Sequence, residues 1–99
     1  MRSRRLLKLK HDRTDLGFLS ASLSEDEMAR DPSWTLRVES PSSAEDFRVH
    51  LMDGSSMALS MVTRDGTLLR GDAYVSGISD GVDTATIVLL AGAGPLRRA

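Results

Sequence analysis

The sequence of 99 residues has no cysteine, only two histidines and no long apolar run. Without cysteine the chain forms no disulfide, thiolate metal site or thiol nucleophile, so neither redox chemistry nor an oxidising compartment is implied. No apolar run approaches the roughly 20 residues that a membrane-spanning helix requires. A chain of this length builds one small core, and a second full domain does not fit. We therefore expect residues 1–99 to form a single domain.

The beginning of the chain is basic, as the beginning of a secretion signal is. Its apolar stretch consists only of Leu6 and Leu7 before Lys8 interrupts it, and a secretion signal needs a longer one. We therefore expect a protein that stays in the cytoplasm of the cell that makes it.

Positive and negative charges nearly balance overall but are distributed unevenly along the chain. The formal net charge is −1, whereas residues 1–13 hold six basic side chains against Asp12 and carry +5, which leaves −6 for the rest. We expect residues 1–13 to form a basic N-terminal arm or an edge strand that contacts an acidic surface or discourages wrong strand pairing. The basic residues of this segment are Arg2, Arg4, Arg5, Lys8, Lys10 and Arg13.

Three Asp-Gly pairs separate apolar or β-branched runs in the second half of the chain. They are Asp53-Gly54, Asp65-Gly66 and Asp80-Gly81. Because Asp-Gly tolerates the positive φ angles of tight hairpin turns, this spacing predicts a meander of consecutive strands. The four strands of the meander are expected at 47–52, 57–63, 68–78 and 84–91, with further strands at 34–38 and around Leu7 and Leu9.

The helical signals are weak. Ser24-Glu-Asp-Glu27 has the spacing of a capping box, and Asp31-Pro32 ends the expected helix within two turns. Residues 42–46 form a weaker candidate that we expect to be a turn. The fold class predicted from these patterns is all-β and mainly antiparallel, a small β-sandwich or barrel of five to six strands with one short helix.

The expected last strand is apolar on both faces. Ala85, Ile87, Leu89 and Ala91 alternate with Thr86, Val88 and Leu90, so both sides of this strand need a cover. A chain of this size has little material of its own for that purpose. The cover is either the short helix or another subunit, and the candidate interface residues are Ile87, Val88, Leu89 and Leu90.

Patterns typical of catalysis and metal binding are missing. Of the histidines His11 and His50, the second is expected on a strand face shared with Arg48 and Met52. No His-x-His, no Glu-x-x-His and no Gly-x-Ser-x-Gly elbow occurs. The Gly92–Pro95 segment is not followed by a helix, so it does not match a phosphate-binding loop. We expect no catalytic residue, no metal site and no cofactor.

Two glycine-containing segments near the C-terminus form a pattern. Gly71-Asp-Ala-Tyr-Val75 lies within the strand expected at 68–78, and Gly92-Ala-Gly-Pro-Leu96 follows the next. Together with the strand that starts at Thr84, they resemble the closing hairpin of the major tail (tail tube) proteins of tailed phages. The resemblance covers the C-terminal third of the chain. It implies a β-sandwich with one helix, whose subunits form rings that stack into a tube without enzymatic activity.

Two functional hypotheses follow. The first is a structural protein resembling a phage tail tube or tail-associated subunit, which oligomerises through β-strand surfaces, has other tail proteins as partners and ends in the virion tail. The alternative is a small SH3-like or OB-like barrel that binds nucleic acid through the basic N-terminal arm. Neither hypothesis involves a membrane or a small-molecule substrate. A third hypothesis, a small enzyme that uses Asp and Ser side chains, has no support in the spacing of these residues.

Overall fold

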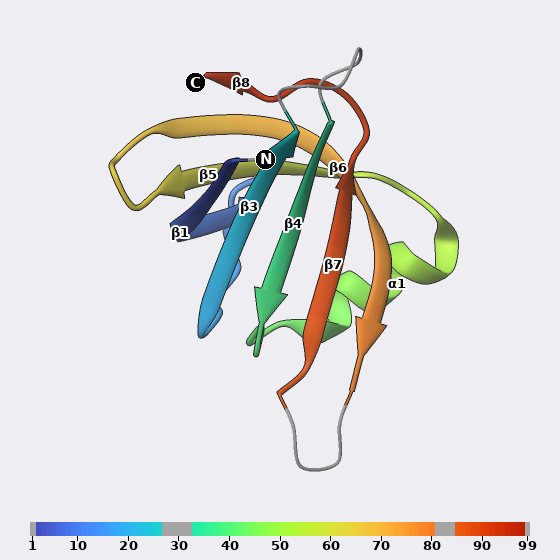
Figure 1. The fold of residues 1–99 in the computed structure, drawn as a ribbon. Coiled ribbons are helices and arrows are strands. Elements are labelled where there is room, and N and C mark those ends of the chain that lie inside the picture. The colour runs from blue at the N-terminus through green and yellow to red at the C-terminus, as the bar shows by residue number, and fades with distance from the viewer. Residues whose placement is uncertain (1, 27–32, 81–84, 99) are drawn as a thin grey trace.

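The computed structural model describes residues 2–26, 33–80 and 85–98, which form a closed antiparallel barrel with one helix (Figure 1). The last strand in the order of pairing, β5, pairs with β1 and closes the barrel. The predicted all-β domain is thereby confirmed, and its form is a barrel. In their order around it, the strands are β1 (Arg2–His11), β3 (Ser20–Asp26), β4 (Ser33–Glu39), β7 (Ile87–Gly92), β6 (Leu68–Ser79) and β5 (Met57–Thr63).

Strand β1 is part of the barrel wall. Its first half, Arg2–Arg5, pairs with β3, and its second half, Leu6–His11, pairs with β5. A register shift between Leu6 and Lys8 forms a bulge, which turns both Leu6 and Leu9 into the core and leaves Leu7 exposed. Residues 2–11 are therefore built into the fold and do not form a free arm.

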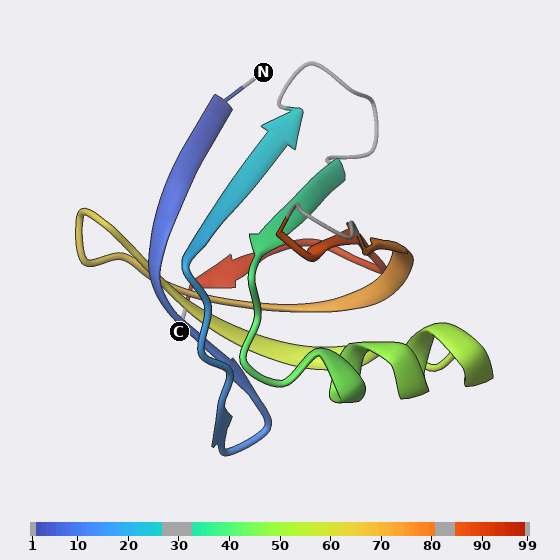
Figure 2. The same cartoon turned by 90° about the horizontal axis from the view of Figure 1, so that it is seen from below.

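Three smaller elements lie outside the barrel wall. Strand β2 (Thr14–Asp15) pairs with β1, and β8 (Arg97–Arg98) pairs with β6. Helix α1 (Ala44–Asp53) connects β4 to β5 and packs against β6 beside one end of the barrel (Figures 1 and 2). Phe47 is the buried residue of this helix and has no exposed surface. The helix is therefore attached to the barrel chiefly through one aromatic side chain.

The core follows from the alternation of side chains along the strands. In β4, Trp34, Leu36 and Val38 point inward while the residues between them are exposed, and β5 alternates in the same way. These strands thus contribute every second side chain to the interior, whereas the bulge interrupts this alternation in β1. The fully enclosed side chains include Leu9, Leu23, Leu36, Val38, Phe47, Met57, Met61, Val88 and Leu90.

The strand predicted at 47–52 is wrong, because this segment belongs to helix α1. Glu45 and Asp46 lie in the first helical turn, where acidic side chains interact favourably with the helix dipole. Gly54 adopts a left-handed conformation with φ of 73° and ends the helix through a hydrogen bond from its N–H to the carbonyl of His50. Asp53-Gly54 is therefore a helix end and not a hairpin turn.

The helix predicted to start at Ser24 is also wrong where the structure describes it, since Ser24, Glu25 and Asp26 end strand β3. Ser24 pairs with Ser3 of β1 on one side and Thr35 of β4 on the other. Pairing on both edges satisfies the backbone groups of this segment and outweighs its local preference for a helix start. The remainder of that prediction, residues 27–32, lies outside the described residues.

The other two Asp-Gly pairs fall between paired strands. Asp65-Gly66 forms the turn from β5 to β6, and Gly66 has a φ of 91°. Strands β6 and β7 also form a hairpin, with Ser79 opposite Ile87, but Gly81 lies outside the described residues. The last strand begins at Ile87, so Ala85 and Thr86 precede it, and Thr84 is not described.

Candidate functional site

The outer side of β7 carries the apolar surface that the sequence analysis singled out. Leu89 points outward with 47% of its surface exposed, and Ile87 is partly exposed on the same side. Val88 and Leu90 point into the core. Of the four candidate interface residues, two are therefore on the surface and two belong to the barrel interior.

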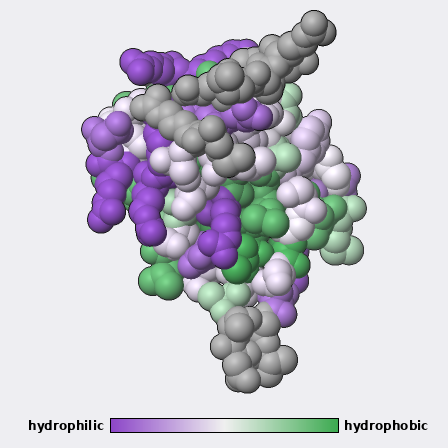
Figure 3. Space-filling view, in the orientation of Figure 1, coloured by the Kyte–Doolittle hydropathy of each residue, from purple (hydrophilic) through white to green (hydrophobic). Residues whose placement is uncertain are grey.

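Tyr74 of β6 extends this apolar surface. It lies opposite Ala91 of β7 and is 48% exposed. We call the outward residues Ile87, Leu89 and Ala91 together with Tyr74 the β7 face. Figure 3 shows hydrophobic side chains gathered in the middle of the molecule, over the position that β7 occupies in Figure 1. The β7 face is thus apolar at its centre.

The surroundings of Leu89 are largely polar. Arg37 of β4 and Gly77 of β6 are its partners across the two strand pairs, and the hydroxyl of Ser76 donates a 3.0 Å hydrogen bond to the Leu89 carbonyl. Arg37 forms an ion pair of 2.6 Å with Glu39. A shallow hollow of about 320 Å³ adjoins Leu89. It is lined by Ser22, Ser24, Thr35, Leu36, Arg37, Ser76, Leu89 and Leu90.

The basic residues near the N-terminus are separated by the strand geometry of β1. Arg4 is mostly buried and pairs with Glu25 of β3 at 3.1 Å. Arg5 is exposed, and Lys8 and Lys10 point outward from the second half of the strand. The backbone of Arg2 pairs with Glu25. The mostly buried Arg4 is therefore separated from the exposed side chains of Arg5, Lys8 and Lys10.

The structure brings the two histidines together, which the sequence analysis missed. The rings of His11 in β1 and His50 in α1 meet edge to face, with centroids 5.0 Å apart. The expectation that His50 lies on a strand is wrong. His50 is turned toward the end of β1 because residues 44–53 form a helix. The contact between the two histidines could have been predicted only if this helix had been predicted first.

His50 also belongs to a small hydrogen-bonded group at the end of α1. Its Nδ1 lies 2.7 Å from the hydroxyl of Ser55, which donates a 2.6 Å hydrogen bond to the Asp53 carboxylate. Hydrogen bonds from the Ser55 side chain and backbone lower the pKa of Asp53. A hydrolase triad places histidine between serine and the carboxylate, whereas here the serine lies between the other two. The group closes the helix end and does not match that catalytic arrangement.

A second polar contact joins the helix to the end of β6. The Arg48 guanidinium pairs with the Asp80 carboxylate, which also accepts a 3.0 Å hydrogen bond from the Thr86 hydroxyl. The hydrogen bond from Arg48, followed by that from Thr86, lowers the pKa of Asp80, and the same pair raises the pKa of Arg48. These groups are exposed, and they fix the position of α1 beside the β6–β7 hairpin.

Within residues 2–26, 33–80 and 85–98, no group of three or more His, Asp or Glu side chains is placed to hold a metal ion. In the same segments, no helix has the length and apolar character needed to cross a membrane.

Comparisons with known proteins give no further constraint on the function. No protein-family model, curated protein or solved structure matches this chain. Functional conclusions therefore rest on the surfaces of the barrel itself.

Proposed function

We propose that this chain is a non-enzymatic assembly module that associates with further copies of itself through the β7 face. The observation that carries the proposal is the exposure of Leu89. This apolar side chain is 47% exposed on β7, a strand that is paired on both sides, and Tyr74 of β6 lies beside it. Tyrosine and other aromatic residues are enriched where proteins associate. A second copy supplies the cover that 99 residues leave incomplete.

The surface around Leu89 suits contact with an identical copy. The serine and threonine side chains beside it are short, and they border a shallow hollow that can receive a leucine side chain from a second copy. In a two-fold arrangement the same patch faces itself, so Leu89 of each copy enters the hollow of the other. Specific interfaces bury about 800 Å² on each partner, so the contact extends from β7 over β4 and β3.

The particular form of assembly that we propose is a phage tail tube or a tail-associated subunit, with ring-forming copies and other tail proteins as partners in a virion. Its support is the resemblance carried by Gly71–Val75 and Gly92–Leu96. The first segment lies in β6, which provides Tyr74, and the second begins at Gly92, the last residue of β7, which provides Leu89. The residues of the resemblance thus adjoin the surface proposed to assemble.

The solution mass of the purified protein, measured by light scattering over a wide concentration range, tests the proposal. The native chain is expected to form dimers or larger species, and Leu89→Lys is expected to remain folded and become monomeric. Met52→Lys is the matched control, because Met52 is an exposed apolar residue on α1, away from the β7 face.

A native chain that is monomeric at every concentration contradicts the proposal. Equal loss of association in Leu89→Lys and Met52→Lys contradicts the assignment to the β7 face. Circular dichroism of both variants confirms that their barrels are intact.

A further inference from the structure

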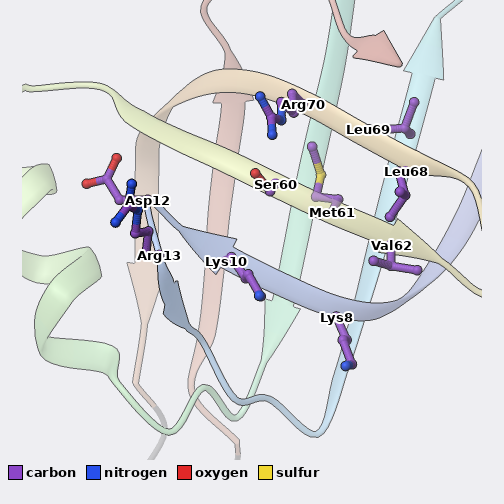
Figure 4. A pocket seen from close by; sticks show the side chains of 10 residues that line it. All are labelled: Lys8, Lys10, Asp12, Arg13, Ser60, Met61, Val62, Leu68, Leu69 and Arg70. Carbon is purple, nitrogen blue, oxygen red and sulfur yellow. The ribbon is translucent and has the colours of Figure 1, made fainter. Parts of the chain in front are cut away.

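Basic side chains from both ends of the chain meet on the outer side of β1, β5, β6 and β8. Three adjoining hollows lie here, and Arg70 lines all three. The first has a volume of about 430 Å³ and is shown in Figure 4. We call the three hollows together the basic trough. Its cations are Lys8, Lys10, Arg13, Arg70, Arg97 and Arg98.

Strand register aligns several of these residues across the trough. Lys10 of β1 pairs with Ser60 of β5, Ser60 pairs with Arg70 of β6, and Arg70 pairs with Arg97 of β8. Directly paired residues of neighbouring strands point to the same side of a sheet. With strands about 4.8 Å apart, the row from Lys10 to Arg97 spans roughly 14 Å.

The trough concentrates positive charge on a chain that is slightly acidic overall. Its six cations face two lining carboxylates, Asp12 and Asp72, which gives +4 for the trough and −5 for the rest of the chain, since the total is −1. Lys10 has a loose, exposed ion pair with Asp15 at 3.9 Å. Among the described residues, no carboxylate lies within 4 Å of the charged groups of Arg70 and Arg97.

The pairing of Arg70 with Arg97 is unfavourable in the isolated protein. Like charges directly opposite each other destabilise a strand pair, and β8 consists of only Arg97 and Arg98. A polyanion that contacts both guanidinium groups removes this repulsion. Arginine is also well suited to phosphate, because its planar fork can donate two parallel hydrogen bonds.

We propose that the basic trough binds the phosphate backbone of double-stranded nucleic acid without reading its sequence. The row from Lys10 to Arg97 is comparable in length with the major groove of B-DNA, which is about 12 Å wide, so its two ends can contact phosphates on both sides of one groove. The hydroxyl of Ser60, in the middle of the row, adds a neutral donor of the kind that commonly contacts phosphate.

The composition of the trough distinguishes this ligand from other anionic partners. The centres of protein interfaces are depleted in charged residues, whereas surfaces that bind DNA are strongly positive. Surfaces that bind single strands use aromatic side chains for base stacking, and the lining of the trough contains none. Its cations therefore fit a duplex backbone better than a protein surface or a single strand.

Fluorescence anisotropy with a short DNA duplex, the same sequence as a single strand, and a series of salt concentrations tests the proposal. If the native chain neutralises about four phosphates, its affinity for the duplex falls by about 150-fold between 50 and 200 mM salt. The double variant Arg70→Ser, Arg97→Ser removes two contacts, so its affinity falls by only about 12-fold over this range. At 50 mM salt it is also expected to bind at least tenfold more weakly than the native chain.

The matched control is the double variant Arg5→Ser, Arg64→Ser, which removes two exposed arginines that do not line the trough. It is expected to keep the native affinity within about twofold. A second variant, Arg70→Lys with Arg97→Lys, keeps both charges and is expected to keep the native salt dependence. Absence of native binding at 50 mM salt overturns the proposal, as does an equal loss in the control. A single strand that binds more tightly than the duplex overturns the choice of ligand.

This test is independent of the one for assembly. No residue of the β7 face lines the trough, so Leu89→Lys is expected to bind the duplex through the same six cations. The two experiments can therefore contradict the assembly proposal and the duplex-binding proposal separately.

Discussion

The indole N–H of Trp34 donates a hydrogen bond of 2.7 Å to the carbonyl oxygen of Gly94, 60 residues further along the chain. Gly92 and Gly71 lie close against the same indole, with Leu96 beside Gly71. Three glycines of the tail-protein resemblance, Gly71, Gly92 and Gly94, thus lie beside one buried tryptophan from β4. Gly71 and Gly92 leave room for that ring, whereas Gly94 supplies the carbonyl oxygen that accepts its hydrogen bond.

Replacing Gly92 by alanine is expected to destabilise the protein. The added methyl carbon would lie 2.5 Å from Cε2 of the rigid Trp34 ring, which forces the strand or the ring to move. Overpacking of this kind costs about 2–3 kcal/mol in the free energy of unfolding. Urea denaturation measures the difference. Gly94→Ala is the control, because a methyl group there meets no atom within 4 Å, and an equal effect of both substitutions contradicts the explanation.

The β5–β6 turn depends on the conformation of Gly66. Its φ of 91° is strained for any residue with a side chain, so Gly66→Ala is expected to lower the free energy of unfolding by about 1–2 kcal/mol. Gly77 provides the comparison, since its φ is not in the positive region and an added methyl group has open space. Thermal denaturation of both variants checks the prediction. A melting temperature for Gly66→Ala that equals the native one refutes it.

Stability in acid is expected to depend on Asp65 in the same turn. Hydrogen bonds from the Thr63 hydroxyl, and then from Thr67, lower the pKa of Asp65 from 3.8 to about 2. A carboxylate whose pKa is lower in the folded state contributes stability above its unfolded pKa and loses it as the pH falls through the folded value. The native free energy of unfolding should therefore decrease as the pH falls from about 4 toward 2.

Asp65→Asn tests this contribution, because asparagine keeps the accepting oxygen but does not titrate. Denaturant unfolding at several pH values should show a shallower decrease for the variant over the same interval. Asp53 and Asp80 also have lowered pKa values, so part of the acid dependence is expected to remain. Identical acid profiles for the native chain and the variant would contradict the role of Asp65.

Helix α1 is expected to depend on Phe47 for its attachment. Phe47 is fully buried, whereas Val49, two residues later, is 53% exposed. Removing a buried phenylalanine side chain costs about 3–5 kcal/mol, so Phe47→Ala should lower the free energy of unfolding by an amount in this range. Val49→Ala should change it by less than about 0.5 kcal/mol. Chemical denaturation of the pair decides the matter, and similar values for both would show that the helix is held by other contacts.

Features that depend on neighbours in the chain could be predicted from the sequence. The apolar run Met57–Thr63 between two Asp-Gly pairs identified one strand. The alternation in Trp34–Val38 identified another, because side chains of a strand alternate between faces whatever its partners are. Asp65-Gly66 identified a hairpin, because glycine tolerates a positive φ. The last strand is apolar on both sides, as predicted, but the sequence named all four of Ile87, Val88, Leu89 and Leu90 as interface candidates. Only the structure separated the outward Ile87 and Leu89 from Val88 and Leu90 in the core.

The sequence pattern was misleading in two segments where it is compatible with both a strand and a helix. Phe47, Val49 and Leu51 alternate with polar residues as in a strand, yet they belong to a helix of which only Phe47 is buried. Ser24 begins a capping box, yet it pairs with strands on both sides. In both cases contacts from distant segments outweighed a preference that is worth little by itself.

The sequence by itself determined a small all-β domain without cysteine chemistry, because composition and strand periodicity are local properties. Only the tertiary structure decided that β1 closes the barrel, since the pairing of Leu6–His11 with β5 depends on segments about 50 residues apart. The same closure brought Lys10, Arg70 and Arg97 into one row and His11 beside His50. Which charges and rings share a surface is set by strand register and curvature, and these are fixed only when the whole barrel has formed.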